Sequence, residues 1–342
     1  MDKLIVSLQY SGFLGSIVLN ALLLHLLFHK ASSSFGRYKI LMISFSIFAI
    51  FYSIVDVLTL PVIFAKGRSI CVCSNGPLKL FRSIGVPLTA VYCGSFGLCI
   101  SLLALHFFYR YIAVCKPEKM YYFDEKHICY TFVLSIFIFV AWTITTYFPM
   151  LPDEMREEYY SDVLMDNFLT DSHETSFLVM MYKTPPDRPE PVEWIYSQLL
   201  ACGFMCFQMS TCSFVMLFCG YKAVVQMKHS EVHMSSKTRN LSRQLMMTLG
   251  AQTLLPFTTV FLPVGLIIVL PVFGIDVGVA ANKTAAFLGI YPALDPMIAI
   301  FLIKDFRYFV FCRSESSYVS SALSLTSHPS KVFKIVKRNN AA

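Results

Sequence analysis

Two carboxylic acids, Asp56 and Asp295, interrupt long apolar runs in which an ionisable group costs about 2.5–3.5 kcal/mol on membrane-insertion scales. A pair of such acids can share general acid and base work, as an intramembrane aspartyl protease would require. At ~1.5 Å per helical residue, however, Asp56 lies roughly 25 Å from Lys39 and Asp295 roughly 13 Å from Lys304, the basic residues that mark the inner boundary. The two layers differ by roughly 10 Å, and no glycine motif flanks either acid. We therefore expect binding or switching roles for these acids.

Asn20 lies roughly 15 Å above the same boundary, level with Asp295. The two side chains could hydrogen-bond across the first and the last run. We assign Asp295 and Asn20 to a switching core and Asp56 to the ligand side. Each assignment has a structural alternative. Asn20 would only hold the bundle together, and Asp56 would be a neutral or hydrogen-bonded acid in an outer polar network.

Five further candidates for ligand contact lie in the outer halves of the runs: Tyr92, Phe96, Gln208, Phe261 and Tyr291. In a chain with 31 Phe and 18 Tyr, ordinary helix packing is the alternative for each aromatic residue. His25 and His106 show no metal-ligand spacing, and we expect structural histidines, no metal site and no cofactor.

The inner ends of the third, sixth and seventh runs carry the other candidates. The third run ends in Tyr109-Arg110-Tyr111, where Arg110 can reach a partner protein or serve only as a basic anchor at the membrane surface. Pro292 and Pro296 free backbone carbonyls around Asp295 and allow a kink, as prolines do in the sixth run. Kinked inner ends are what a helix-swinging switch requires, although prolines are common in membrane helices generally.

Seven apolar runs must position these residues: Leu4–His29, the stretch between Lys39 and Lys66, Ser83–Tyr109, Ile128–Pro152, Trp194–Tyr221, Gln244–Ile275 and Thr284–Ile303. Each reaches the roughly 20 residues that cross the hydrocarbon core as helix. With 56% hydrophobic and only 14% charged residues, the chain lacks the polar surface of a soluble protein. The net charge of +7 sits in short segments between the runs, so we expect no nucleic-acid partner. We predict an all-α membrane protein, a seven-transmembrane helix bundle with a short amphipathic eighth helix.

The distribution of Lys and Arg predicts the orientation. With the N-terminus outside and the C-terminus in the cytoplasm, 19 of the 28 basic residues fall in inner segments. One outer connection does not fit this orientation, because it holds four basic residues: Lys66, Arg68, Lys79 and Arg82. Cys71 and Cys73 in the same connection are candidates for oxidation, without an evident partner.

The long acidic connection 152–193 holds eleven Asp and Glu residues and no cysteine. Its composition favours a solvated, partly disordered loop. The alternative is a lid over a cavity, or a field that attracts cations.

Beyond the seventh run, Lys304–Phe311 is basic and amphipathic and suits the membrane interface. Cys312 is a candidate for palmitoylation. Residues 313–342 form a Ser-rich, basic tail, whose serines could be phosphorylated or belong to a plain linker and whose basic end would lie on an anionic leaflet. The N-glycosylation sequon Asn282-Lys-Thr284 lies very close to the membrane, and we expect it not to be glycosylated.

Several of these motifs together resemble a known group. The seven runs, Tyr109-Arg110-Tyr111-Ile-Ala113-Val and the Asp295-Pro296 turn resemble rhodopsin-like G-protein-coupled receptors. The chain is similar, over most of residues 10–312, to the nematode seven-transmembrane chemoreceptors of the Str class, the class that includes the diacetyl odorant receptor. Four stretches in the right order carry that similarity: Tyr38–Met42 with Tyr52, His106–Pro117, Arg243–Pro256 and Tyr291–Arg307.

The resemblance implies an olfactory receptor that binds a small, volatile ligand in the outer half of the bundle and activates a heterotrimeric G protein. Arg110 with Tyr111 would engage the G protein, and Asp295-Pro296 would be the seventh-helix switch. Residues 1–312 would form the receptor domain, with 152–193 extracellular and 313–342 cytoplasmic. The plasma membrane of a sensory cilium, membrane lipids, arrestin and a receptor kinase belong to the same expectation.

The chain departs from the rhodopsin-like pattern at three places. Tyr109 stands where most of those receptors carry an acid, so the usual Arg–carboxylate lock cannot form within that motif. Ala299 stands where their tyrosine follows the Asn/Asp-Pro turn, and the sixth run has no Cys-Trp-x-Pro. A ligand-gated channel or transporter is the alternative function. It would require a polar pore stripe or inverted repeats with broken helices, and the sequence shows neither.

Overall fold

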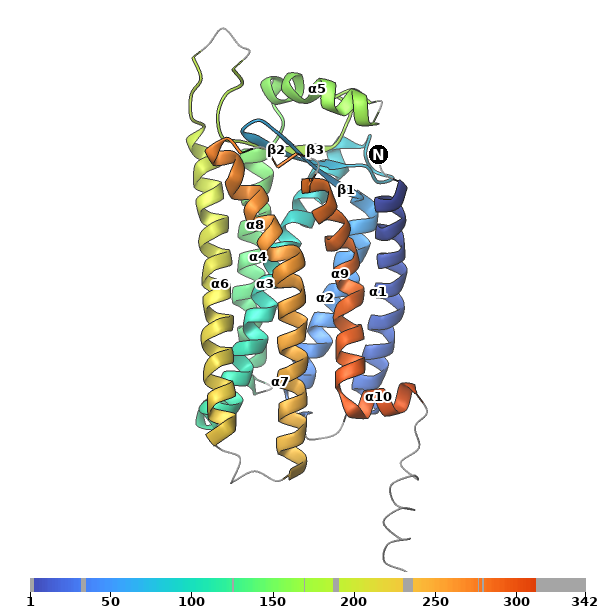
Figure 1. Cartoon of the computed structure of the whole chain (residues 1–342), viewed down its shortest axis with the longest axis vertical. Coiled ribbons are helices and arrows are strands. Elements are labelled where there is room, and N and C mark those ends of the chain that lie inside the picture. The colour runs from blue at the N-terminus through green and yellow to red at the C-terminus, as the bar shows by residue number, and fades with distance from the viewer. Residues whose placement is uncertain are drawn as a thin grey trace, which may run out of the picture.

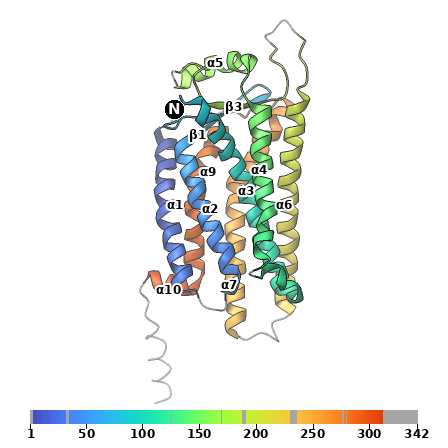
Figure 2. The same ribbon diagram turned by 180° about the vertical axis from the view of Figure 1, so that it is seen from behind.

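The computed structural model describes residues 3–31, 35–124, 126–168, 170–186, 191–229, 236–275, 277–278 and 280–311. Within them, seven helical segments are long and apolar enough to cross a membrane. They are α1 (Lys3–His29), α2 (Tyr38–Thr59), α3 (Arg82–Cys115), α4 (Ile128–Met150), α6 (Tyr196–His229), the composite of α7 (Ser236–Pro256) and α8 (Leu262–Val269), and α9 (Ala280–Leu302). These segments run side by side as a bundle (Figures 1 and 2). The predicted seven-helix bundle is confirmed.

Several helices run past the limits of their apolar runs. α3 continues to Cys115 and α6 to His229, and α7 begins at Ser236. Charged residues end the hydrophobic run but are good helix formers, so the helix need not end where the hydrocarbon does. Between α7 and α8, the π turn Phe257–Phe261 directly follows Pro256. Pro263 stands two residues after this turn, in α8. Proline has no N–H to donate, and its ring crowds the carbonyl four residues earlier, here that of Thr259 in the π turn, which accounts for the irregular backbone at this point.

Small residues set the closest helix contacts. A side chain at Gly12 of α1 would collide with the backbone of Gly289 in α9, and one at Gly15 would lie 3.3 Å from the Cβ of Ala293. Bare backbone on both sides lets α1 and α9 approach closely, as small residues do in membrane bundles.

A three-stranded antiparallel sheet covers the end of the bundle near the N-terminus, which we call the sheet end. Its order is β1 (Pro61–Lys66), β2 (Ser69–Ser74) and β3 (Phe177–Met181). Gly67 opens the two-residue turn between β1 and β2 at φ +57°, as a type II′ hairpin turn requires. The all-α prediction omitted this sheet, because β1 was included in the second apolar run. α2 in fact ends at Thr59, and Leu60 stands before Pro61, where the α conformation is disfavoured.

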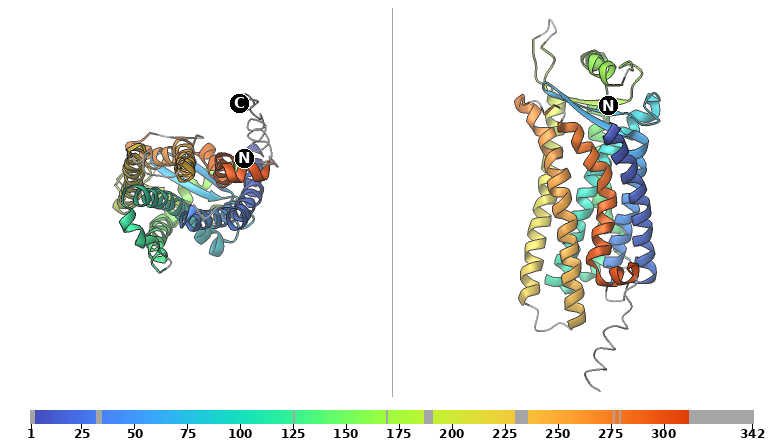
Figure 3. Two further views of the ribbon diagram at one scale, coloured as in Figure 1. Left: turned by 90° about the horizontal axis from the view of Figure 1, so that it is seen from below. Right: turned by 45° about the vertical axis from the view of Figure 1, so that its right-hand side comes forward.

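The acidic connection folds over this sheet. Its helix α5 (Glu154–Phe168) lies above the strands, and its strand β3 joins them (Figure 1; Figure 3, right). Tyr160 and Leu164, one turn apart on α5, are fully buried against the outward-facing side chains Cys71 and Val179. The prediction of a solvated loop is wrong for the described part of this segment. A net acidic composition did not prevent packing because the apolar residues of α5 share one face.

Short helices complete the chain. A 3₁₀ helix spans Pro117–Phe123 after α3, and another spans Leu270–Phe273 after α8. At the opposite end from the sheet, which we call the α10 end, α10 (Lys304–Val310) follows α9 at an angle (Figure 1). Its Phe306 is buried against Phe35, with the ring centroids 5.6 Å apart. Cys312 and the tail 313–342 lie outside the described residues.

Candidate ligand-binding cavity

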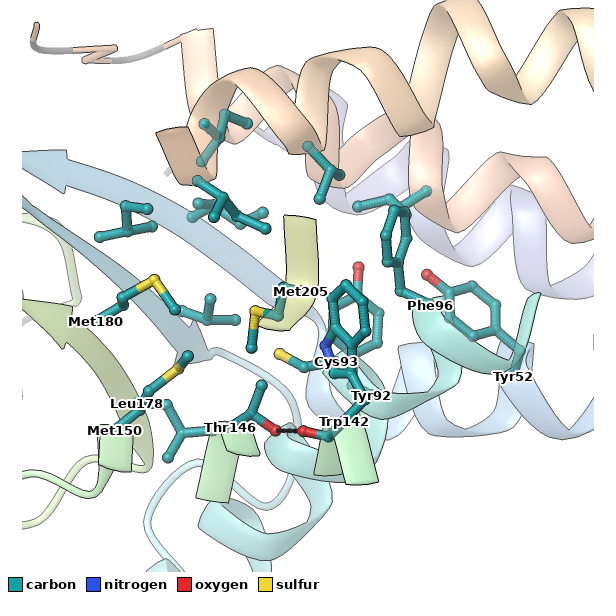
Figure 4. A pocket seen from close by; sticks show the side chains of 17 residues that line it. Tyr52, Tyr92, Cys93, Phe96, Trp142, Thr146, Met150, Leu178, Met180 and Met205 are labelled. Atoms are coloured by element: carbon teal, nitrogen blue, oxygen red, sulfur yellow. Dashed lines mark hydrogen bonds between the residues drawn. The ribbon is translucent and has the colours of Figure 1, made fainter. Parts of the chain in front are cut away.

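A cavity of about 100 Å³ lies between the sheet and the bundle (Figure 4). Its lining comes from β1, β2 and β3 and from the adjacent halves of α2, α3, α4, α6, α8 and α9. The lining side chains are Tyr52, Ile63, Ile70, Val72, Tyr92, Cys93, Phe96, Trp142, Thr146, Met150, Leu178, Met180, Met205, Val264, Ile267, Ile268 and Leu288. None of these residues is charged, so the cavity suits an uncharged ligand.

The roof of the cavity follows from strand alternation. Ile70 and Val72 of β2 and Leu178 and Met180 of β3 face the cavity. The intervening Cys71, Cys73 and Val179 face α5. Successive side chains of a strand point to opposite faces, so a sheet with two apolar faces is held between α5 and the bundle. Seen along the helices, the strands lie across the bundle (Figure 3, left).

Aromatic rings form the wall below the roof. The Phe96 ring of α3 lies 5.5 Å from the Trp142 ring of α4 and 5.5 Å, edge to face, from the Phe261 ring. Gly97 brings α4 this close, because a Cβ there would lie 2.9 Å from the Trp142 ring. On the other side, the rings of Tyr52 and Tyr92 stack at 5.6 Å.

The hydroxyl groups of Tyr52 and Tyr92 are buried close to each other, and neither makes a well-formed hydrogen bond to another group among the residues that the structure describes. The surface of the cavity itself is almost entirely apolar. The two hydroxyls therefore lie beside the cavity, and the rings of these tyrosines are what a ligand would touch.

The structure brings together four of the six residues that the sequence nominated for ligand contact. Tyr92 and Phe96 line the cavity. Phe261 and Tyr291 line a smaller space of about 10 Å³, which shares Tyr52, Phe96 and Leu288 with the first cavity.

Asp56 and Gln208 lie elsewhere. Asp56 is 1% exposed and faces α9, where its Oδ2 would lie 3.0 Å from a Cβ at Gly289, with Gln9 of α1 beside it. Its Oδ1 has no hydrogen-bond partner among the described residues, and the roles expected for Asp56 stay predictions. Gln208 lines a separate groove of about 450 Å³ between α3, α4 and α6, and its Nε2 donates to the Gly97 carbonyl at 3.5 Å. The structure thus brings neither side chain to the cavity.

The roof is tied to the sixth helical segment. Tyr182, the residue after β3, donates its hydroxyl to the carbonyl oxygen of Ile268 in α8 at 2.6 Å. Burial raises the pKa of this phenol, so it remains a donor. A ligand under the roof would therefore touch α8 and the strand that is bonded to it.

The Asn20–Asp295 hydrogen bond that equal depth suggested does not form. Asn20 donates instead to the carbonyl oxygens of Ser16, at 2.9 Å, and Pro292, at 3.0 Å. Asp295 accepts at Oδ2 from Gln252 of α7, at 3.0 Å. Pro292 lies four residues before Pro296, which has no N–H to donate to the Pro292 carbonyl. That carbonyl is therefore free to accept from Asn20. Asn20 still joins α1 to α9, and Asp295 joins α9 to α7.

Arg110 is 6% exposed and lies inside the α10 end of the bundle. Its guanidinium carbon lies 3.8 Å from the centroid of the Tyr38 ring of α2, and its Nε and one terminal nitrogen have no hydrogen-bond partner in the described chain. Tyr109 packs edge to face on Phe123 at 4.8 Å. Tyr111 lies 6.1 Å from Phe218 of α6. An aromatic ring thus holds the arginine where no carboxylate is present within the motif.

Comparison with known proteins agrees with this architecture. Residues 6–311 match the family of serpentine type 7TM GPCR chemoreceptors Str. The chain is 29% identical to serpentine receptor class r-10 of Caenorhabditis elegans, over 94% of this chain and 95% of that protein. It is equally 29% identical to serpentine receptor class r-10 of Caenorhabditis briggsae, with 92% of each chain covered. It is 24% identical to G-protein coupled receptor str-33 of Caenorhabditis elegans, with 86% of each covered.

The chain belongs to the Str family of serpentine chemoreceptors. As a Str chemoreceptor it is a multi-pass membrane protein. Membership of a family of G-protein-coupled chemoreceptors implies a small-molecule ligand and a G protein as partners.

Sequence reasoning missed much of the cavity of this Str chemoreceptor. Its roof, and Trp142, Met150 and Met205 of the wall, were not nominated. Trp142 could have been found, since it is one of two tryptophans in the chain and is accommodated by Gly97. The roof residues carried no such signal, because the composition of the segments that hold their strands predicts a membrane span or a loop.

Proposed function

We propose that this chemoreceptor binds a small, uncharged, volatile ligand in the cavity under the sheet and activates a heterotrimeric G protein at its α10 end. The single observation that carries the proposal is the uncharged cavity of about 100 Å³ that touches six of the seven spans. Burying an ion there without a partner would be costly. A molecule of this kind can also leave water for the cavity by way of the bilayer.

The proposed signal starts at α8. Val264, Ile267 and Ile268 face the cavity, and the π turn at Phe257–Phe261 lies between them and α7. A ligand that pushes α8 would tilt α7 about this turn. α7 contacts Asp295 through Gln252, so the movement reaches the switch in α9. A ligand that fits the tilted state better shifts the population toward it.

The inner switch would end at Arg110. In this structure Arg110 is covered and rests on Tyr38. We propose that it becomes accessible to the G protein, with Tyr111, when α7 moves away. Asp295-Pro296 and Asn20 would set the balance between the two states, since all three lie in the contacts of α9.

The rest of the proposal concerns the setting of the receptor. The sheet end with the N-terminus would face outward and the α10 end the cytoplasm, in the plasma membrane of a sensory cilium. Arrestin, a receptor kinase and membrane lipids would act at the α10 end. An epitope tag before Lys3 should then be stained on intact cells, and a tag after residue 342 only after permeabilisation.

The test is a ligand panel applied to cells that express the full chain, read as G-protein dissociation. Phe96→Ala should weaken the response, whereas Phe137→Ala, at a 65% exposed position of α4, should not. Arg110→Ala should abolish the signal at unchanged surface expression. A ligand-evoked current that survives Arg110→Ala would favour the channel alternative and overturn the proposal.

A further inference from the structure

Four sulfur-bearing side chains surround the cavity: Cys93, Met150, Met180 and Met205. They are 4 of its 17 lining residues, about one in four. The whole chain has 11 Cys and 16 Met in 342 residues, about one in thirteen. The cavity is therefore about threefold enriched in sulfur.

The four sulfur atoms come from different elements. Cys93 belongs to α3, Met150 ends α4, Met180 lies in β3 and Met205 lies in α6. No single helical stripe or strand explains their gathering. Figure 4 shows their sulfur atoms around the same open space, opposite the rings of Trp142 and Phe96.

Sulfur and aromatic rings have a specific affinity. A thioether is polarisable and gains about 0.3–1.5 kcal/mol against a ring edge beyond ordinary packing. A ring also gains from edge-to-face contact with other rings, such as those of Trp142 and Phe96. A saturated ligand of equal size gains only from the burial of its surface. A cavity of the order of 150 Å³ with aliphatic and aromatic walls can hold benzene. At about 100 Å³ this cavity is smaller, so one ring is the largest occupant that it can take, with the flexible methionine side chains adjusting around it.

We propose that the cavity selects an uncharged one-ring aromatic molecule over its saturated counterpart, and that the sulfur atoms of Met150, Met180 and Met205 determine this selectivity. The inference rests on the proposed function, because it specifies the ligand of the same cavity.

The test compares anisole with cyclohexyl methyl ether, which have one ether oxygen each and differ in the ring. Binding to the purified full-length receptor is followed by the fluorescence of Trp142, excited at the red edge of its absorption. Trp194→Phe leaves Trp142 as the single tryptophan of the chain, since the sequence has two. G-protein dissociation in cells is measured with the same two compounds.

Anisole should bind more tightly by about 2- to 13-fold for each sulfur–ring contact, the factor that corresponds to the sulfur–aromatic gain. Met150→Leu and Met205→Leu keep the volume nearly constant, and together they should bring the ratio of the two affinities most of the way to one. Met180→Leu is added last, because the Sδ of Met180 also lies 2.7 Å from the Tyr182 hydroxyl, and the triple variant should bring the ratio close to one. Met209→Leu is the matched control, because Met209 lies one turn below Met205 on α6 and outside the lining.

Equal affinities in the wild type, or a ratio unchanged in the triple variant, would overturn the inference while a G-protein response to either compound leaves the proposed function standing. Failure of both compounds to alter Trp142 fluorescence would overturn it as well. Selective binding without any G-protein response would support the inference and contradict the proposed function.

Discussion

Under the proposed function, the contact between Arg110 and Tyr38 would hold the inactive state in a receptor that has no acid beside its arginine. A cation over an aromatic ring gains about 0.5–2 kcal/mol. The guanidinium lies 3.8 Å from the ring centroid, and both side chains are buried. The ring therefore takes the place of the carboxylate, and the arginine remains charged and ready to bind elsewhere.

Replacement of Tyr38 should activate the receptor without ligand. Tyr38→Leu removes the ring, and the loss of about 0.5–2 kcal/mol should raise basal activity roughly 2- to 30-fold. Tyr38→Phe keeps the ring and removes only the hydroxyl, which also contacts Arg110, so its basal activity should rise much less. Basal G-protein dissociation, normalised to surface expression, measures both. Equal basal activity of the two variants would show that the ring does not restrain Arg110.

The thiols of the sheet provide a pH-dependent readout of its burial. Burial raises the pKa of Cys73 from 9.0 to about 12 and that of Cys71 well above its ordinary value. The unfolded chain loses these protons near pH 9, whereas the folded sheet retains them. The sheet is therefore fully stabilised below pH 9 and loses stability as pH rises from 9 toward 12, by up to about 1.4 kcal/mol per unit for Cys73.

Alkylation of the purified receptor, followed by mass spectrometry, checks this prediction. Only the thiolate reacts readily, so Cys71 and Cys73 should remain unmodified near pH 8 and react as pH approaches 12. Cys129, which is exposed, serves as the internal control and should react throughout. Rapid modification of Cys73 near pH 8 would mean that the sheet opens freely.

At the scale of elements, the π turn after Pro256 is the feature that suits a hinge. It separates α8, which lines the cavity, from α7, which contacts Asp295. Pro263→Ala restores a backbone donor for the π turn and allows a straight helix. Ligand affinity should remain within about twofold, and the maximal response should fall severalfold, since the two halves would no longer tilt separately. Concentration–response curves measure both quantities.

Pro256→Ala is the control for this prediction. Pro256 is the last residue of α7, and its ring and missing N–H act on the carbonyl of Gln252, within the regular part of that helix. Its replacement should leave the maximal response unchanged. An equal loss in both variants would remove the special role of the π turn.

The limits of sequence reasoning are also clearest at this scale. Helix periodicity and hydropathy identify the seven spans, because each span must satisfy its backbone within itself whatever its neighbours are. Phe96 and Tyr92, which the sequence nominated, line the cavity, since rotation around α3 is set by its own apolar and small residues. β1 could not be separated from the second span, because a strand with two buried faces reads as a continuous apolar run. The position of Gln208 depends on how far α4 and α6 diverge, and no local pattern encodes that distance.

At the scale of the whole molecule, hydrogen bonds and an ion pair explain why basic residues occur in the connection 66–82, at the end that is predicted to face outward. Arg82 donates to Glu157 of α5 at 2.6 Å and to the carbonyl of His173. Lys66 donates to the carbonyl of Tyr159 at 2.6 Å, and Arg68 to that of Val272 at 3.0 Å. Lys66 and Arg82 thus fasten the acidic segment over the sheet, and Arg68 joins the sheet to the short helix after α8. Their presence at this end therefore has a structural reason that is independent of the positive-inside rule, and the proposed orientation keeps its support from the remaining connections.

The Arg82–Glu157 pair should control how fast a ligand leaves the covered cavity. It joins the first turn of α3 to α5, and its carboxylate is only 11% exposed, so the pair is better shielded than an ordinary surface ion pair. Arg82→Gln loses a charge-assisted bond, and ligand dissociation should accelerate by roughly 10-fold if that bond is worth about 1.5 kcal/mol in the closed state.

Arg37→Gln, which breaks the more exposed pair with Asp124 at the α10 end, is the matched control and should leave dissociation unchanged. The exchange Arg82→Glu with Glu157→Arg should recover part of the slow rate, because the charge pair is restored while the bond to His173 is not. Dissociation from the purified receptor, measured after dilution, separates these cases. Unaltered dissociation in Arg82→Gln would show that ligands exchange through the helices rather than past α5 and the sheet.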